Sequence, residues 1–165
     1  GMGLPEHIHR YYLGFTDIYP QIGEWHVRLA QEALKYKVVS LPSGREYRFP
    51  YVRRTARGIT HGTSVKNYPV QGFATADLLP SALVETSKAF KDKNLKSLLC
   101  NTVHDSIVVD VHPGEEDQVI ETVKECMLSI PQQAKKRWGI EYDMPVGIEI
   151  KIGSNWLDTK EIFSN

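Results

Sequence analysis

Apolar side chains recur every three or four positions in residues 4–19 and again in residues 22–34. This spacing places them on one face of a helix, so the sequence predicts two amphipathic helices. The residue before a proline is disfavoured in helical geometry, and the first helix should therefore end at Tyr19-Pro20. His26 lies on the apolar stripe of the second helix, where a partly buried structural histidine is the simplest interpretation.

Residues 36–41 and 46–50 are short β-type runs, and the turn residues 42–44 between them predict a β-hairpin. Residues 51–66 follow without periodicity and are rich in glycine, threonine and arginine. We expect a long loop here, and such a loop inside a compact domain is usually functional or disordered. Its arginines are suited to contacts with phosphate groups, although a solvated loop has the same composition.

The next helix is predicted over residues 67–90, beginning at an Asn-x-Pro sequence. Pro80 lies inside the helical pattern and should kink or interrupt the helix. Asn67, Gln71 and Thr75 share one face at four-residue spacing. Their amide and hydroxyl groups form a row that is suited to hydrogen bonding with base edges or sugars. Asn-x-Pro is also an ordinary helix-capping pattern, so the row leaves both interpretations open.

Two β-rich apolar runs, residues 98–103 and 107–111, are separated by the polar residues His104, Asp105 and Ser106. We interpret them as a buried hairpin with an acid and an imidazole at its turn. A carboxylate removed from water needs a cation or several hydrogen-bond donors. The turn is therefore a candidate metal-binding site, although an isolated His-Asp pair is more often a hydrogen-bonded structural turn.

The last third of the chain is predicted to contain an amphipathic helix that starts at residues 113–116 and stops near Pro131, a short helix at 132–138 and a strand at 144–152. Residues 153–156 should turn out of this strand into a short tail. Helices alternate with hairpins along the sequence, and there is no glycine-rich phosphate loop. This order favours an α+β fold in which helices pack on one face of an antiparallel sheet.

Composition narrows the choice of function only a little. The 165 residues are 41% hydrophobic and 24% charged, with a formal net charge of zero. A strongly basic domain is excluded, so a nucleic-acid surface requires local clustering, such as the five arginines of residues 45–57. Cys100 and Cys126 lack metal-ligand spacing and are interpreted as free thiols of a reducing cytoplasm. No apolar run is long enough to span a membrane.

Four sequence blocks, in order and at similar spacing, resemble the motifs of family A DNA polymerases, the bacterial DNA polymerase I group. The blocks are SLPSGREYRFP at residues 40–50, NYPVQGFATADLL at 67–79, TVHDSIVVDV at 102–111 and PVGIEIKIGSNW at 145–156. Phage-type members look the most similar. The resemblance implies that residues 1–165 are the C-terminal palm part of an incomplete polymerase domain. It also implies a palm-type antiparallel sheet with a catalytic hairpin and N-terminal helices from the junction of fingers and palm.

The resemblance implies a role for each residue that matches a motif. Asp105 would hold the catalytic Mg²⁺ ions of a two-metal site, and His104 would lie beside the primer terminus. Gln71 and Asn67 would contact the minor-groove side of the primer–template end, and Arg45 the template backbone. Amide donors suit this task because minor-groove acceptors look alike in every correct base pair, so geometry is checked without reading sequence.

Other basic residues extend the predicted DNA-binding surface. They are Arg53, Arg54, Arg57 and Lys66. Three positions depart from the usual family pattern, and one of them is Thr75, which replaces an alanine of the helix motif. Ser106 stands where the motif usually has glutamate, and it cannot supply a second charge to the metal. Thr63 stands where cellular enzymes usually have arginine, so that Lys66 becomes the candidate substitute for this DNA contact.

Two family motifs are absent from the sequence: the DYS-type motif with the first catalytic carboxylate, and the fingers helix that binds the incoming nucleotide. Asp77, Asp92 and Asp110 are not plausible replacements. The resemblance therefore implies one of two metal carboxylates, with the Mg²⁺ site incomplete in this chain alone and no primer extension by it. The expected partners are primer–template DNA, deoxynucleoside triphosphate and the remainder of the polymerase.

Two other functions stay open. One is a non-catalytic nucleic-acid-binding module on the same fold. The other is an unrelated metal-dependent hydrolase using His104 and Asp105, which would need two or three further ligands that no histidine spacing provides. We expect a cytoplasmic protein without membrane association, in a bacterial host if a phage or prophage encodes it. Palm surface that normally packs on fingers and thumb would be exposed, which favours homo-oligomers.

Overall fold

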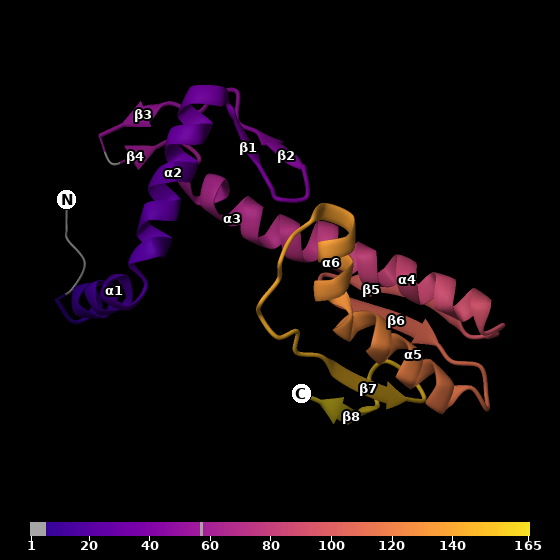
Figure 1. Ribbon diagram of the computed structural model, residues 1–165. Helices are drawn as coiled ribbons and strands as arrows, with labels where there is room; N and C mark the ends of the chain where they lie inside the picture. Colours follow the sequence, from indigo (N-terminus) through magenta and orange to yellow (C-terminus); the bar gives the residue numbers. More distant parts are fainter. Residues whose placement is uncertain (1–5, 57) are drawn as a thin grey trace. The chain divides into compact units, whose positions relative to one another are not determined.

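The computed structural model describes residues 6–56 and 58–165 (Figure 1). The chain divides into two compact units, Gly1–Val70 and Gln71–Asn165, and each is described by itself. Within the described residues no helix has the length and apolar character needed to cross a membrane. Arg57, one of the predicted DNA-binding residues, and the predicted start of the first helix lie outside the described part of the chain.

The first unit begins with two helices, α1 (Glu6–Ile18) and α2 (Pro20–Tyr36). The predicted break at Tyr19-Pro20 is confirmed, and Pro20 occupies the first position of α2, where its missing N–H would have no helical partner anyway. α2 ends at Lys37, which adopts a left-handed conformation with φ of 59° and donates its N–H to the carbonyl of Ala33.

The first predicted hairpin is also confirmed. Strands β1 (Val38–Ser40) and β2 (Glu46–Arg48) pair antiparallel, and Gly44 in the connecting turn has a φ of 86°, which favours glycine. The hairpin and α2 share a core with residues from further along the chain. The buried members of this core are Leu29, Ala33, Val39, Phe49, Val52 and Val65.

The prediction of a long loop over residues 51–66 is wrong. β3 (Arg54–Thr55) and β4 (Gly58–Ile59) form a short hairpin, and α3 (Gly62–Gly72) begins before the expected start at Asn67. The Thr60 hydroxyl accepts the N–H of Arg53 at 3.1 Å and closes the segment. A short hairpin of this kind is held by single hydrogen bonds, and it therefore produces no periodic pattern in the sequence.

In the second unit the helix continues as η1 (Phe73–Leu78), a π-helical segment, and α4 (Leu79–Asp92). The predicted disturbance near Pro80 takes this form: the hydrogen-bonding pattern changes just before the proline. Pro80 lies in the first turn of α4, where a missing N–H is tolerated. π-helical segments are rare and often occur near functional sites.

The rest of the second unit alternates hairpins and helices. Its elements are β5 (Leu98–Val103), β6 (Ser106–Asp110), α5 (Glu116–Leu128), α6 (Ile130–Trp138), β7 (Glu149–Gly153) and β8 (Thr159–Ser164). The core of the unit brings η1 and α4 against α6 through Leu78, Ala82, Ile130 and Ala134. The predicted α+β class is confirmed, and the strands of the described residues pair as four antiparallel hairpins.

The prediction of a short tail after residue 153 is wrong, because the chain returns as β8 and pairs with β7. Asn165 fixes the end of this hairpin. Its side-chain oxygen accepts the N–H of Ile148 at 2.8 Å, and its own N–H donates to the Ile148 carbonyl at 3.3 Å. The strand prediction at 144–152 also began too early, since β7 starts at Glu149.

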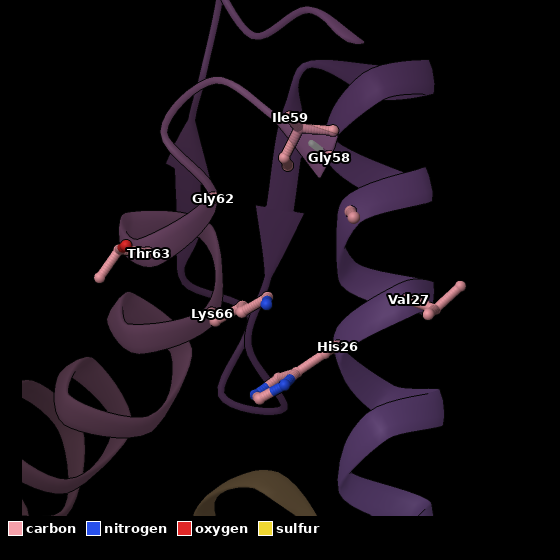
Figure 2. Close-up of a pocket in the computed structure, with 8 residues that line it drawn as sticks. His26, Val27, Gly58, Ile59, Gly62, Thr63 and Lys66 are labelled. Carbon is pink, nitrogen blue, oxygen red and sulfur yellow. The ribbon is translucent and has the colours of Figure 1, made fainter. Parts of the chain in front are cut away.

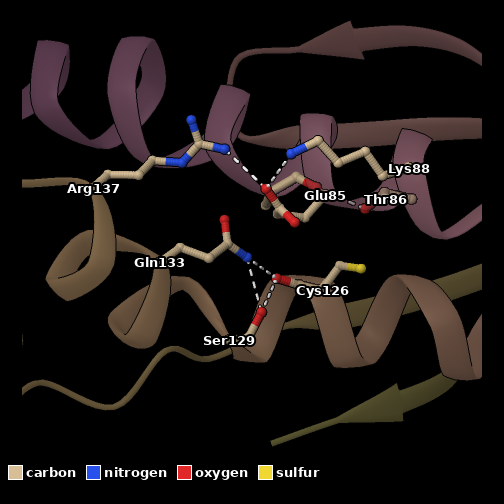
Figure 3. A network of polar contacts seen from close by, with 8 residues as sticks. Glu85, Thr86, Lys88, Cys126, Ser129, Gln133 and Arg137 are labelled. Atoms are coloured by element: carbon tan, nitrogen blue, oxygen red, sulfur yellow. Dashed lines mark hydrogen bonds and ion pairs between the residues drawn. The ribbon is translucent and has the colours of Figure 1, made fainter.

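Polar contacts join the three helices of the second unit (Figure 3). The Glu85 carboxylate on α4 accepts a hydrogen bond from Arg137 on α6 at 2.9 Å. Gln133 on α6 donates to the carbonyl of Cys126 and to the hydroxyl of Ser129, both at 2.8 Å. Burial raises the pKa of the Cys126 thiol, and both cysteines are free, as predicted.

A second polar cluster holds the base of the β5–β6 hairpin. The Glu115 carboxylate, just before α5, accepts the N–H groups of Lys96 and Ser97 at 2.9 Å each and the Ser97 hydroxyl at 2.6 Å. The Ser97 oxygen in turn accepts the N–H of His112 at 2.9 Å. One carboxylate therefore ties the entry and exit of the hairpin to the start of α5.

Replacing Glu115 by glutamine is expected to lower the melting temperature at about pH 7 and to change it little at about pH 3. The Ser97 hydroxyl and the backbone N–H groups lower the pKa of Glu115 from its ordinary value of 4.5. A carboxyl with a lowered folded-state pKa stabilises the fold above its unfolded pKa, and this contribution is lost as the pH falls through the folded value. Melting curves across this range, with Glu121→Gln as an exposed control on α5, check the effect. A constant difference at every pH would contradict it.

Candidate functional site

His104 and Asp105 form the two-residue connection between β5 and β6, flanked by the paired residues Val103 and Ser106. His104 has a φ of 54°, a left-handed conformation that costs a non-glycine residue roughly 1 kcal/mol or more. Both side chains are exposed. The prediction of a buried hairpin is wrong, since Leu98 on β5 is 63% exposed. The apolar run indicated the strands but not what covers them.

The two polar side chains at the end of this turn have different surroundings. The Ser106 hydroxyl donates to the carbonyl of Val103 at 2.9 Å and closes the turn. The exposed Asp105 carboxylate accepts no hydrogen bond from the residues that the structure describes. Ser106 therefore serves the turn itself, and Asp105 is the exposed acid of the turn.

Asp105 by itself does not make a metal cage. Among the described residues, no group of three or more histidine, cysteine or acidic side chains is placed to hold a metal ion. Mg²⁺ is commonly held by one or two carboxylates and completes its octahedral shell with water and substrate phosphates. The hard oxygen of Asp105 fits one such position, and the other ligands must come from outside this hairpin.

The amide residues predicted to contact DNA lie on α3. Asn67 and Gln71 are both exposed and are separated by about one helical turn. The third member of the predicted row behaves differently, because the Thr75 hydroxyl donates to the carbonyl of Gln71 at 2.8 Å. The structure therefore leaves two exposed amides, with the exposed Lys66 beside them in the sequence.

Three of the predicted basic residues of the first unit lie in two hairpins. Arg45 lies in the connection between β1 and β2, and Arg53 and Arg54 lie at the start of the β3–β4 hairpin; all three side chains are exposed. Within the described part of the chain, no acidic side chain pairs with Arg53 or Arg54. Arg48, by contrast, pairs with Glu46 at 3.4 Å. Exposed arginines without an acidic partner, such as Arg53 and Arg54, are suited to phosphate contacts.

A cavity of about 370 Å³ lies between α2, the β3–β4 hairpin and α3. Figure 2 shows His26 pointing into it from α2 and Lys66 from α3. Burial first, and then the charge of Lys66, lower the pKa of His26 from its ordinary value. The sequence correctly indicated a partly buried helix histidine. It did not indicate that this histidine lies across a cavity from Lys66, because helix periodicity carries no information on which helices pack together.

Comparison with known proteins assigns the chain to a family. Residues 6–158 match the sequence model of DNA polymerase family A. The chain therefore belongs to DNA polymerase family A. It is 30% identical over 149 residues to DNA polymerase I of Lactococcus lactis subsp. lactis, which covers 88% of this chain and 16% of that protein. It is 32% identical over 107 residues to DNA polymerase I of Caldicellulosiruptor bescii, covering 65% of this chain and 11% of the relative.

The fold has a counterpart among solved structures. The POL domain of Pol1 from M. smegmatis, in a complex with DNA primer-template and dNTP, matches with a TM-score of 0.65 and 23% identity. The match covers 80% of this chain and 22% of that chain. At this identity the likeness concerns the fold alone. In the sequence comparison, the chain spans about a sixth of the length of its Lactococcus lactis relative.

Proposed function

We propose that this chain supplies the C-terminal palm part of a DNA-directed DNA polymerase and contributes to template-directed nucleotidyl transfer. The observation that carries the proposal is the family match over residues 6–158, together with an acid, Asp105, held at the tip of a tight hairpin. Primer–template DNA and deoxynucleoside triphosphate, present in the complex of the M. smegmatis relative, are the proposed partners.

In this proposal Asp105 provides one oxygen ligand to Mg²⁺. The metal ions of a polymerase lower the pKa of the primer 3′-hydroxyl and stabilise the charge that develops on the phosphate. A two-residue turn between paired strands restricts the position of the carboxylate more than a long loop would. His104, next to it in the turn, is proposed to lie beside the primer terminus.

The first unit and α3 are proposed to hold the DNA. Asn67 and Gln71 donate from α3 to minor-groove acceptors, which have similar positions in every correct base pair. Arg45, Arg53 and Arg54 contact backbone phosphates, with Arg57 as a further candidate. Such contacts position the duplex and carry no sequence information, as a copying enzyme requires.

The chain alone is proposed to lack primer-extension activity. Its sequence carries no DYS-type motif and no nucleotide-binding fingers helix, and it spans a sixth of the length of a polymerase relative. The first carboxylate and the nucleotide site would come from the remainder of the polymerase. Similarity to phage-type members, a cytoplasmic location and self-association through exposed palm surface stay predictions.

Replacing Arg53 and Arg54 together by alanine is expected to weaken primer–template binding and to reduce the salt dependence of the binding constant. Each lost phosphate contact reduces the slope of log K against log salt by about one. Fluorescence anisotropy with the purified chain and a labelled primer–template, between about 50 and 300 mM salt, measures both quantities. The matched control is Arg48→Ala, because Arg48 already pairs with Glu46. If the double variant keeps the wild-type slope, these arginines do not contact phosphates.

A further inference from the structure

Two neighbouring cavities follow the facing sides of α2 and α3. The first, of about 370 Å³, is lined by both helices and by Gly58 and Ile59 of β4. The second, of about 360 Å³, is lined by Trp25, Asn67 and Val70 together with three residues that also line the first. The shared residues are His26, Thr63 and Lys66. The two cavities therefore form one groove, called the α2–α3 groove below.

The α2–α3 groove carries the positive charge of Lys66 without an acidic partner. Among the residues that line it, all of them described, Lys66 is the charged one, and His26 is the titratable side chain that faces it. No carboxylate of the described residues pairs with the Lys66 ammonium. A lysine and a histidine held together in this way repel each other when both are charged. An anion bound between the two side chains would attract both of them and offset this repulsion.

The backbone adds to the same field. α3 begins at Gly62, and both Gly62 and Thr63 line the first cavity. The N–H groups of the first turn of a helix have no helical acceptors and carry partial positive charge. At about 30 Å³ per water molecule, the first cavity has room for a phosphate group and several waters.

The groove also has an apolar wall and an amide at one end. The ring centroids of Trp25 and His26 lie 5.4 Å apart, so the indole forms a flat surface beside the imidazole. Asn67, proposed above to contact the primer–template end, lines the second cavity. A lysine, an imidazole that can take up a proton, an aromatic wall and an amide together match a sugar–phosphate unit better than a free inorganic anion, which would leave the apolar wall unused.

We propose that the α2–α3 groove binds a backbone phosphate of DNA between His26 and Lys66, adjacent to the base-pair contact of Asn67. This proposal rests on the proposed function and adds His26 to the DNA-binding residues.

Proton uptake follows from this arrangement. In the free chain, burial and Lys66 lower the pKa of His26. A bound phosphate stabilises the imidazolium and raises this pKa, so DNA binding should take up a proton at His26. Primer–template affinity should therefore rise as the pH falls from about 8 to about 6.

The test measures primer–template binding by the purified full chain over this pH range and over a salt series. Lys66→Met is expected to weaken binding about tenfold and to reduce the salt slope by about one. His26→Gln is expected to lose most of the gain in affinity that the wild type shows between about pH 8 and about pH 6. Lys35→Met, on the exposed end of α2, is the matched control and should change neither quantity.

The outcomes separate this proposal from the proposed function. If Lys66→Met and His26→Gln both keep wild-type affinity, slope and pH dependence while Arg53→Ala/Arg54→Ala weakens binding, the groove proposal is overturned and DNA binding stands. If the wild-type chain binds no primer–template, both proposals fail. A separate titration with inorganic phosphate tests for binding of small anions. Binding is followed through the imidazole NMR signals of His26. A shift with inorganic phosphate that primer–template does not compete away would assign the groove to small anions and overturn the DNA assignment.

Discussion

Replacing Asp105 by asparagine in the complete polymerase is expected to lower Mg²⁺-dependent primer extension by about a thousandfold. Asparagine keeps the size of the side chain and removes the charge that would hold the metal. Since metal stabilisation of a phosphoryl-transfer transition state is worth several kcal/mol, loss of one ligand should appear in the chemical step. Single-turnover extension of a labelled primer, in an assembly that supplies the missing carboxylate and nucleotide site, measures this step.

The control for this change is Asp110→Asn. Asp110 is an exposed acid at the far end of β6 in the same hairpin, where it pairs with Leu98 across the ladder. Its loss should leave extension nearly unchanged. Primer–template affinity should be similar in both variants, because neither acid is proposed to bind DNA. Extension by the isolated wild-type chain that is lost in Asp105→Asn would show that this chain is active alone.

The structural features that the sequence predicted correctly depend on neighbouring residues. The break at Tyr19-Pro20, the turn at Gly44 and the β5–β6 hairpin each follow from a few consecutive side chains. Proline fixes one backbone angle, glycine permits a positive φ, and alternating apolar runs favour strands. Asp105 and His104 could be identified as candidates because the polar interruption is itself a local pattern.

The features that the sequence did not predict depend on contacts between distant segments. β8 is a polar strand that exists because β7 and Asn165 hold it. His26 and Lys66 line the same cavity because α2 packs beside α3. Periodicity identifies the apolar face of each helix but not the helix that packs against it. Burial of the β5–β6 hairpin was predicted from apolar content alone, yet apolar residues are also common at protein surfaces.

The packing that forms the α2–α3 groove can itself be tested through Phe49. This residue is 7% exposed and belongs to the core that includes Leu29 and Ala33 of α2 and Val65 of α3. Its ring centroid lies 6.0 Å from that of Tyr68. Phe49→Ala removes most of this contact surface and leaves a cavity, and such changes usually cost about 3 to 5 kcal/mol.

The expected result of Phe49→Ala is therefore a fall of about 3 kcal/mol or more in the free energy of unfolding of the first unit. Hydrogen exchange resolved by residue is the suitable measurement, because a chain with two compact units need not unfold in one step. Tyr51→Ala is the control, since Tyr51 is 80% exposed and should give a small change.

Protection should fall in α2 and α3 and stay nearly constant in α5 and α6, whose core residues belong to the second unit. Because His26 and Lys66 are carried on α2 and α3, primer–template affinity should fall together with this protection. Equal loss of protection in both units would instead mean that they unfold together. Unchanged protection in α2 and α3 would mean that Phe49 does not support the core that positions the groove.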